Sequence, residues 1–242
     1  MAQPHQGSRL QSALDLVTKL CIIAAALTVV FVLASDYRRT NTTRPTRPAD
    51  PVLPTHPVAL LENAAVKGDP AASVVLGMFS DFECKYCANF AVGTWPALEK
   101  EYVATGKMAV AFHHFAISGH RLAPRAAAAA ECARQQGQFW PMHDRMFRNQ
   151  NRLGDADLLN GAADIGLNMP QFGGCLSRDT GQAIAADAML ATTLGVSATP
   201  TFFLGRVQGS DRQVLVTKRL RGALSFGEFQ KVLAEFGALG TQ

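Results

Sequence analysis

The sequence predicts an α/β domain that follows an N-terminal transmembrane helix and a proline-rich tether. Apolar, β-rich runs surround a long helix-forming stretch, which gives the order β-α-β, helical insertion, β-β-α. Residues 20–34 (LCIIAAALTVVFVLA) are apolar throughout. Residues 36–58 hold five prolines and almost no large apolar side chains, a composition that cannot bury a core. These observations divide the chain into an anchor, a linker and one folded domain.

The length and composition allow a substantial core. The chain has 242 residues, of which 48% are apolar, so one medium-sized domain plus an appendage is expected. The formal net charge is only +4, and no motif that reads DNA or RNA is visible. We therefore expect no nucleic acid among its partners.

The apolar run at residues 20–34 predicts a membrane span, extended toward Leu16 if Lys19 reaches the headgroups. A cleaved signal peptide is the alternative, because Val32-Leu33-Ala34 places small residues before Ser35. An uncleaved anchor is favoured, since the preceding segment is long and the apolar run exceeds a typical signal core. Residues 1–35 are thus assigned to a cytoplasmic segment and the anchor.

The charges that flank this run do not favour export of the C-terminal part. Arg9 and Lys19 precede it, and four arginines follow it between residues 38 and 47, against the positive-inside rule. The cysteine content is more typical of an oxidising compartment. We therefore expect a membrane-anchored protein with its domain outside the cytoplasm, in the periplasm or at the cell surface.

Residues 36–72 are expected to be a linker, with a short helical or strand-like segment at 60–67, and residues 73–242 the domain. The domain opens with a strand at 73–80 and a helix that Trp95-Pro96 should kink, because proline lacks an N–H. Gly106 is expected to end this helix. Small and large apolar residues alternate over 107–117, which predicts a second strand.

Residues 119–195 are expected to form the helical insertion. Phe139, Met142, His143, Met146 and Phe147 recur at spacings of three and four, as on one face of a helix. Asp155 is a candidate cap for the next helix, and Asp179 or Thr180 for the one after it.

Strand character returns at 201–204 and 213–217, separated by a turn-rich segment. The chain closes with a capping box, Ser225 to Glu228, followed by a helix with an apolar stripe. Its members are Phe226, Phe229, Val232, Leu233 and Phe236.

Cys84 and Cys87 carry the strongest chemical signal. They lie where the first strand turns into a helix, and a helix N-terminus favours a thiolate through its unpaired N–H groups and dipole. At this spacing the second sulfur can attack a mixed disulfide made by the first. The pair therefore predicts a redox centre, with Cys84 as the exposed nucleophile and Cys87 as the buried resolving thiol.

Several stretches together resemble the DsbA-like thiol:disulfide oxidoreductases, in which a helical domain is inserted into the thioredoxin fold. The pattern of CxxC followed about 110 residues later by Thr-Pro-Thr-Phe-Phe is the most specific of them. The matching stretches are SDFECKYC at 80–87, YVATGK at 102–107, AAECA at 129–133, QFWPMHD at 138–144 and LGVSATPTFF at 194–203.

The resemblance implies a cis peptide bond before Pro200 that faces the disulfide, where the backbone of Thr199 can pair with an extended substrate. It also implies that the protein oxidises reduced extracytoplasmic proteins and that a membrane redox partner, passing electrons to a quinone, reoxidises it. The reaction uses the two sulfurs, so no cofactor is expected.

The dipeptide between the cysteines, Lys85-Tyr86, departs from the family, whose members often have Pro or His there. A cation at Lys85 is expected to stabilise a nearby thiolate, which would make the disulfide more oxidising. The departure leaves the direction of electron flow open. A membrane-anchored reductase, for example in cytochrome maturation, and a non-catalytic thioredoxin-like binding module are the alternatives.

The remaining cysteines have structural interpretations. Half of a zinc site is an alternative for the CxxC, but His113 and His114 are adjacent on a strand and point to opposite faces, so no metal is expected. Cys132 and Cys175 are predicted to form a structural disulfide, partly because some relatives have a second pair; two buried thiols are the alternative. Cys21 lies in the membrane run and is expected to be inert.

Several polar and aromatic residues could lie near the CxxC. Asp81 and Glu83 could tune the thiol or accept a proton, but Glu83 is expected to be a solvated rim residue. His113, His114 and His120 are assigned no catalytic role beyond a minor electrostatic effect of His114. Phe139, Trp140 and Phe147 are expected to pack in the core, with a groove for apolar peptide side chains as the alternative.

Overall fold

The structure is a computed structural model and describes residues 7–42, 52–178 and 181–238. It divides into two compact units, Met1–Asp50 and Pro51–Gln242, which are described in turn. The cap expected at Asp179 or Thr180 lies outside the described residues.

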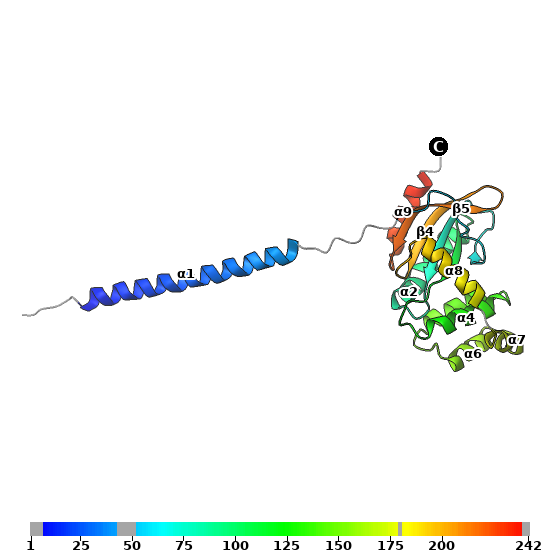
Figure 1. Ribbon diagram of the computed structural model, residues 1–242, viewed down its shortest axis with the longest axis horizontal. Helices are drawn as coiled ribbons and strands as arrows, with labels where there is room; N and C mark the ends of the chain where they lie inside the picture. The colour runs from blue at the N-terminus through cyan, green and yellow to red at the C-terminus, as the bar shows by residue number, and fades with distance from the viewer. Residues whose placement is uncertain (1–6, 43–51, 179–180, 239–242) are drawn as a thin grey trace, which may run out of the picture. The chain divides into compact units, whose positions relative to one another are not determined.

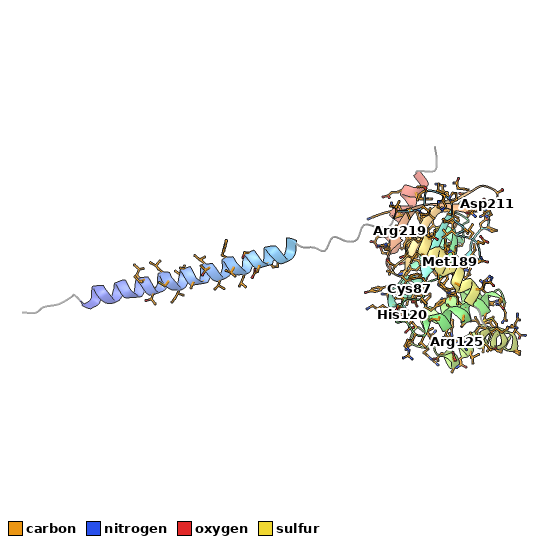
Figure 2. All side chains as sticks on the ribbon, in the orientation of Figure 1. Cys87, His120, Arg125, Met189, Asp211 and Arg219 are labelled. Carbon is orange, nitrogen blue, oxygen red and sulfur yellow. A yellow bond between two sulfur atoms is a disulfide. The ribbon has the colours of Figure 1, made fainter. Side chains whose placement is uncertain are left out.

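The first unit is the helix α1, Gly7–Thr42 (Figure 1). Its segment Leu16–Tyr37 has 22 residues and, within the described chain, is the one helix long and apolar enough to cross a membrane. At about 1.5 Å per residue it is roughly 33 Å long, close to the thickness of a bilayer's hydrocarbon core. None of this segment is buried by the described protein, and its apolar side chains extend outward as sticks in Figure 2. The predicted N-terminal apolar helix is confirmed, with the run 20–34 inside it.

The second unit is built on a five-stranded sheet with the order β1-β3-β2-β4-β5. β2 pairs with β3 in parallel, whereas the other neighbouring strands pair antiparallel. The strands are β1 Ala65–Lys67, β2 Val74–Ser80, β3 Ala109–His114, β4 Thr201–Gln208 and β5 Gln213–Arg221. The predicted α/β class is confirmed.

The linker expected over residues 36–72 was wrong in its later part, because the chain already packs on the sheet there. Val58 exchanges backbone hydrogen bonds with Val214, and β1 pairs with β3. Leu60 is fully buried, and a Cβ on Gly77 would come within 2.7 Å of its side chain. The close approach of Leu60 to β2 therefore requires glycine at position 77. The proline-rich composition of residues 36–58 gave no sign of this contact.

Side chains of the central strand alternate between two apolar clusters, as the pleat requires. Leu76 and Met78 belong to the larger cluster, which includes side chains of the helical block and of the C-terminal helix. Val75 and Phe79 belong to the smaller one, which is covered by the segment containing Leu60 and by the helix α8, Gly181–Thr193 (Figure 1).

The helical segment that begins within the CxxC is irregular on both sides of Trp95-Pro96, and the kink expected there stays a prediction. It begins with α2, Lys85–Asn89, and continues as a π-helical turn Phe90–Thr94, α3 Trp95–Leu98 and a second π-helical turn Glu99–Val103. Gly106, at φ +72°, follows its end. This left-handed conformation suits glycine.

The helical block between β3 and β4 has five helices in the described chain. They are α4 Ala123–Arg134, α5 Phe139–Arg148, α6 Asp155–Asp164, α7 Met169–Leu176 and α8 Gly181–Thr193. Phe139 and Phe147 are buried and Trp140 is partly buried in the core, as expected. The cap expected at Asp155 was wrong, because Gly154 precedes α6 and makes no side-chain capping bond.

The last helix, α9, covers Phe226–Ala238. The predicted capping box is confirmed, because Glu228 accepts from the backbone N–H of Ser225 at 2.7 Å and donates its own N–H to the Ser225 hydroxyl. Phe229 is fully buried, and Leu233 and Phe236 are nearly so.

Candidate redox site

Cys84 lies at the junction of β2 and α2. It is in an extended conformation directly before the first helical residue, and its N–H donates to the carbonyl of Asp81. Cys87 follows within the first turn of α2. Both are free thiols and both are buried, with exposures of 4% for Cys84 and 1% for Cys87, so the expectation that Cys84 is exposed was wrong.

The Thr199-Pro200 segment faces this junction from the start of β4. Its peptide bond is cis, and the Cys84 thiol lies 3.5 Å from the Thr199 carbonyl oxygen. The structure thus brings together all four residues expected at the site, Cys84, Cys87, Thr199 and Pro200, although 115 positions separate Cys84 from Thr199.

The two thiols have opposite acidities. The pKa of Cys84 is lowered to about 5, and the largest cause is a hydrogen bond from Cys87. A hydrogen bond with Thr199 and the backbone N–H groups of Cys87 and Tyr86 add to the lowering, and together these bonds outweigh the opposing effect of burial. Burial is the largest reason that the pKa of Cys87 is strongly raised, and the neighbouring Cys84 raises it further. At neutral pH the reduced pair is therefore a Cys84 thiolate next to a protonated Cys87.

A cavity of about 380 Å³ opens beside Cys84. It combines apolar, charged and aromatic side chains. The lining residues are Glu83, Cys84, Lys85, Tyr86, Ile117, His120, Ala198 and Thr199. Its size and the exposed Tyr86 allow a protein side chain to enter next to the sulfur.

Lys85 and Tyr86 are both exposed at the rim of this cavity. The Lys85 ammonium lies 5.1 Å from the centre of the Tyr86 ring, within cation–π range. The largest contributions to the low pKa of Cys84 come from hydrogen bonds with Cys87 and then Thr199, followed by the backbone N–H groups of Cys87 and Tyr86. The tuning role expected for Lys85 and Tyr86 therefore stays a prediction.

Glu83 is not the solvated rim residue that the sequence predicted. Its carboxylate accepts from the backbone N–H groups of Leu122 at 2.7 Å and Ala123 at 3.0 Å, where α4 begins. These N–H groups have no partner within the helix, and a negative charge is favourable at this end. Glu83 thus attaches the CxxC turn to the helical block.

Asp81 is buried and accepts three hydrogen bonds. One carboxylate oxygen accepts from the N–H of Glu83 at 2.8 Å. The other accepts from the N–H of Ile117 at 2.8 Å and lies 2.7 Å from Nδ1 of His120. The sequence indicated Asp81 as a tuning residue but gave no sign of its partner, 39 positions away.

Gln150 is a site residue that the sequence analysis missed. Its side-chain amide donates to the carbonyls of Phe82 at 2.9 Å and Cys84 at 2.8 Å. A polar residue in the turn after α5 has no local pattern that reveals such a contact.

His113 and His114 do not line the cavity beside Cys84. His113 pairs with Asp187 of α8 at 2.6 Å and with the Leu60 carbonyl at 2.9 Å. His114 contacts Glu131, whose pKa is lowered because His114 and Arg134 outweigh the raising effect of burial. Both histidines serve buried polar networks.

Cys132 of α4 and Cys175 of α7 are joined by a disulfide, and both are buried. Cys21 is a free, exposed cysteine in α1. Within residues 7–42, 52–178 and 181–238, no group of three or more His, Cys, Asp or Glu side chains is arranged to hold a metal ion.

Comparison with known proteins supports this description. The thioredoxin family model matches residues 61–216. The structure of α-DsbA1 from Wolbachia pipientis superposes with a TM-score of 0.62 and 21% identity, covering 76% of this chain and 92% of that one. The structure of oxidised BdbD from Bacillus subtilis superposes with a TM-score of 0.61 and 19% identity, covering 76% of this chain and 96% of that one. A thioredoxin-like oxidoreductase from Silicibacter pomeroyi superposes with a TM-score of 0.59 and 25% identity, covering 73% of this chain and 94% of that one.

Curated relatives match over a smaller part of their length. The Na(+)/H(+) antiporter NhaA 3 of Salinispora tropica is 36% identical over 141 residues, which are 57% of this chain and 21% of the antiporter. NhaA of Herminiimonas arsenicoxydans is 35% identical over 148 residues, 60% of this chain and 23% of that protein. The chain thus spans about a fifth of the length of these relatives.

The family match includes the CxxC turn, the helical block and the cis-proline segment, and the structural matches extend over the same domain. The chain belongs to the thioredoxin family and has the fold of its DsbA-like members.

Proposed function

We propose that this protein is a membrane-tethered thiol:disulfide oxidase that passes the Cys84–Cys87 disulfide to reduced proteins outside the cytoplasm. The observation that carries the proposal is the contrast between the two thiols, in which Cys84 is acidic beside an open cavity and Cys87 is enclosed and weakly acidic. A stable thiolate is a good leaving group, and stabilisation of the reduced pair makes its disulfide oxidising.

The exchange proceeds in two steps. A substrate thiolate attacks the Cys84 sulfur, the Cys84–Cys87 bond breaks, and the Cys87 sulfur leaves and takes a proton, as its raised pKa favours. A second substrate thiolate then attacks the substrate sulfur of the mixed disulfide and releases the Cys84 thiolate. The substrate gains one disulfide and loses two electrons, and the CxxC pair holds both.

The cavity and the Thr199 segment support a protein as the substrate. The Thr199 carbonyl beside Cys84 is a backbone acceptor next to the reacting sulfur, suited to an extended chain. Tyr86, Ile117 and Ala198 give the cavity apolar walls for a neighbouring side chain.

The anchor and the second cysteine pair support the location. The helix Leu16–Tyr37 would hold the domain near a membrane redox partner that reoxidises Cys84 and Cys87. The bonded pair Cys132 and Cys175 is typical of proteins in oxidising compartments, which agrees with an extracytoplasmic domain. A protease-protection assay on sealed vesicles would test this topology.

Two measurements test the proposed activity. The reduction potential of the Cys84–Cys87 disulfide can be measured by equilibrating the full chain in detergent with glutathione buffers. It should lie nearer to the oxidising end of the family range than to the thioredoxin end, and a thioredoxin-like potential would instead support the reductase. A Cys87→Ser variant in its native membrane should accumulate mixed disulfides at Cys84. The Cys84→Ser variant, which lacks the attacked sulfur, is the control and should capture no client.

A further inference from the structure

We propose that His120, held by Asp81, is the ionic partner of the Cys84 thiolate, so that reduction of the disulfide is coupled to uptake of a proton on His120. This inference deepens the proposed function by adding a positioning residue that controls how the redox equilibrium responds to pH. His120 was assigned no role from the sequence.

The position of His120 in the fold supports this role. It lines the same cavity as Cys84, and Figure 2 labels it together with Cys87. His120 belongs to a tight turn in which its N–H donates to the Ile117 carbonyl at 3.0 Å. Gly119, at φ +97°, takes the left-handed conformation that this turn requires.

The carboxylate of Asp81 holds the ring of His120 in place. One oxygen of the buried Asp81 receives both the Ile117 N–H, at 2.8 Å, and Nδ1 of His120, at 2.7 Å. The turn and the ring are therefore fixed by the same carboxylate, which follows directly after β2. Because Nδ1 faces Asp81, Nε2 is the nitrogen left to exchange a proton with the cavity.

The negative charges around His120 favour its protonated form. The hydrogen bond to Asp81 is the largest reason that the pKa of His120 is raised, and the charges of Asp81, Glu83 and Cys84 act in the same direction against burial. The cation Lys85 lines the same cavity, and Arg121 follows His120 in the chain. Since the pKa of Cys84 is about 5, thiolate and imidazolium coexist from about pH 5 to above the ordinary histidine value.

The coupling follows from the charge that appears on reduction. Two glutathione thiols supply two electrons and become glutathione disulfide, while the Cys84–Cys87 bond breaks, Cys87 takes one proton and Cys84 remains a thiolate. That thiolate is absent from the disulfide form, so His120 is more basic in the reduced form. At a pH between the pKa of His120 in the oxidised form and its pKa in the reduced form, the protein therefore takes up more than one proton when its disulfide is reduced.

The test begins with unmodified full-length protein in detergent. NMR titration of the His120 ring in the chemically oxidised and reduced forms should give a pKa at least about 0.5 higher in the reduced form. The expected difference is small because His120 is partly exposed and solvent screens its interaction with the Cys84 thiolate. Spectra of a His120→Gln variant assign the signal. Equal His120 pKa values in the two forms would overturn the proposal.

The same coupling must appear at Cys84, because linkage is reciprocal. In His120→Gln the Cys84 pKa, followed by thiolate absorbance, should rise by the same amount, with about threefold slower alkylation below pH 5. The exposed His56, which does not line the cavity, provides the control variant His56→Gln. A Cys84 pKa in His120→Gln equal to that of this control would also contradict the proposal.

The two proposals can fail separately. If the wild-type pair did not exchange with glutathione or clients, the oxidase function would fall, while the His120 titration in chemically prepared forms would still decide the coupling. Because that titration uses the wild-type protein, its result does not depend on whether a variant folds.

Discussion

The side-chain amide of Gln150 donates to the backbone carbonyl of Cys84 at 2.8 Å, so a residue of the helical block holds the peptide unit of the candidate nucleophile. The same amide donates to the carbonyl of Phe82 at 2.9 Å. These two bonds are made from the turn after α5, and Glu83 makes a second attachment to the start of α4. The insertion therefore supports the CxxC turn as well as covering it.

Replacing Gln150 by alanine is expected to lower the free energy of unfolding by about 1–2 kcal/mol, because the carbonyls of Phe82 and Cys84 each lose a side-chain donor. The Cys84 carbonyl keeps the N–H of Ala88, at 3.1 Å. Denaturant unfolding of the oxidised full chain in detergent measures this change. Gln150→Met separates the lost donors from the lost volume and should be nearly as destabilising. The exposed Gln135 gives the control Gln135→Ala, which should change stability by less than about 0.5 kcal/mol.

Local patterns predicted the parts of the fold that local chemistry decides. The capping box of Ser225 and Glu228 needs only a spacing of three, and the strand before Cys84 needs only an apolar run. The order of elements around the CxxC followed from such patterns, and the relation to Thr199 and Pro200 from the resemblance to a known family.

The supports of the site could not be predicted in this way. Asp81 and His120, Glu83 and Leu122, and Gln150 and Cys84 are 39 to 66 positions apart and meet only after the helical block has folded onto the sheet. A strand-like segment was expected at 60–67, where β1 lies, but the packing of the chain before β1 on the sheet was hidden for a different reason. The proline-rich composition before it resembles a tether, yet single residues such as Leu60 pack tightly enough to join the core.

Asp187 joins α8 to β3 and gives a second test of stability. Its carboxylate contacts Nδ1 of His113 at 2.6 Å and accepts from the N–H of His114 at 2.7 Å, with all three residues buried. Asp187→Ala should cost about 2–4 kcal/mol, because both groups lose their partner in the interior.

Thermal or denaturant unfolding measures the loss at Asp187. The comparison is Asp164→Ala, which breaks the exposed ion pair with Arg145 and should cost less than about 1 kcal/mol. Equal losses in the two variants would show that the buried network contributes no more than a surface pair.

The disulfide between Cys132 and Cys175 gives a third prediction. It closes a loop with a sequence separation of 43, for which the chain-entropy treatment gives about 4 kcal/mol of stabilisation. The double variant Cys132→Ala/Cys175→Ala should therefore unfold at much lower denaturant concentration. Its CxxC pair should still react with glutathione under native conditions. Cys21→Ala, at an exposed cysteine of α1, is the control and should unfold like the wild type.

The acidity of Cys84 predicts how pH affects the reduced protein. Its folded pKa of about 5 lies below the ordinary value of 9.0, so the thiolate favours the folded reduced state. This stabilisation is complete above about pH 9 and is lost as the pH falls through 5. Cys87, whose pKa is raised, stays protonated in folded and unfolded chains below pH 9 and contributes nothing in that window.

Alkylation of the reduced protein should show this directly. The rate at Cys84 should be half-maximal near pH 5, whereas an ordinary thiol reaches that point near pH 8.5 to 9. Because the hydrogen bond from Cys87 is the largest cause of the shift, Cys87→Ala should move the midpoint to higher pH. Cys87→Ser keeps a hydroxyl donor and should move it less. If both variants titrated like the wild type, Cys87 would not be the group that makes Cys84 acidic, and backbone N–H groups at the start of α2 would have to account for the thiolate.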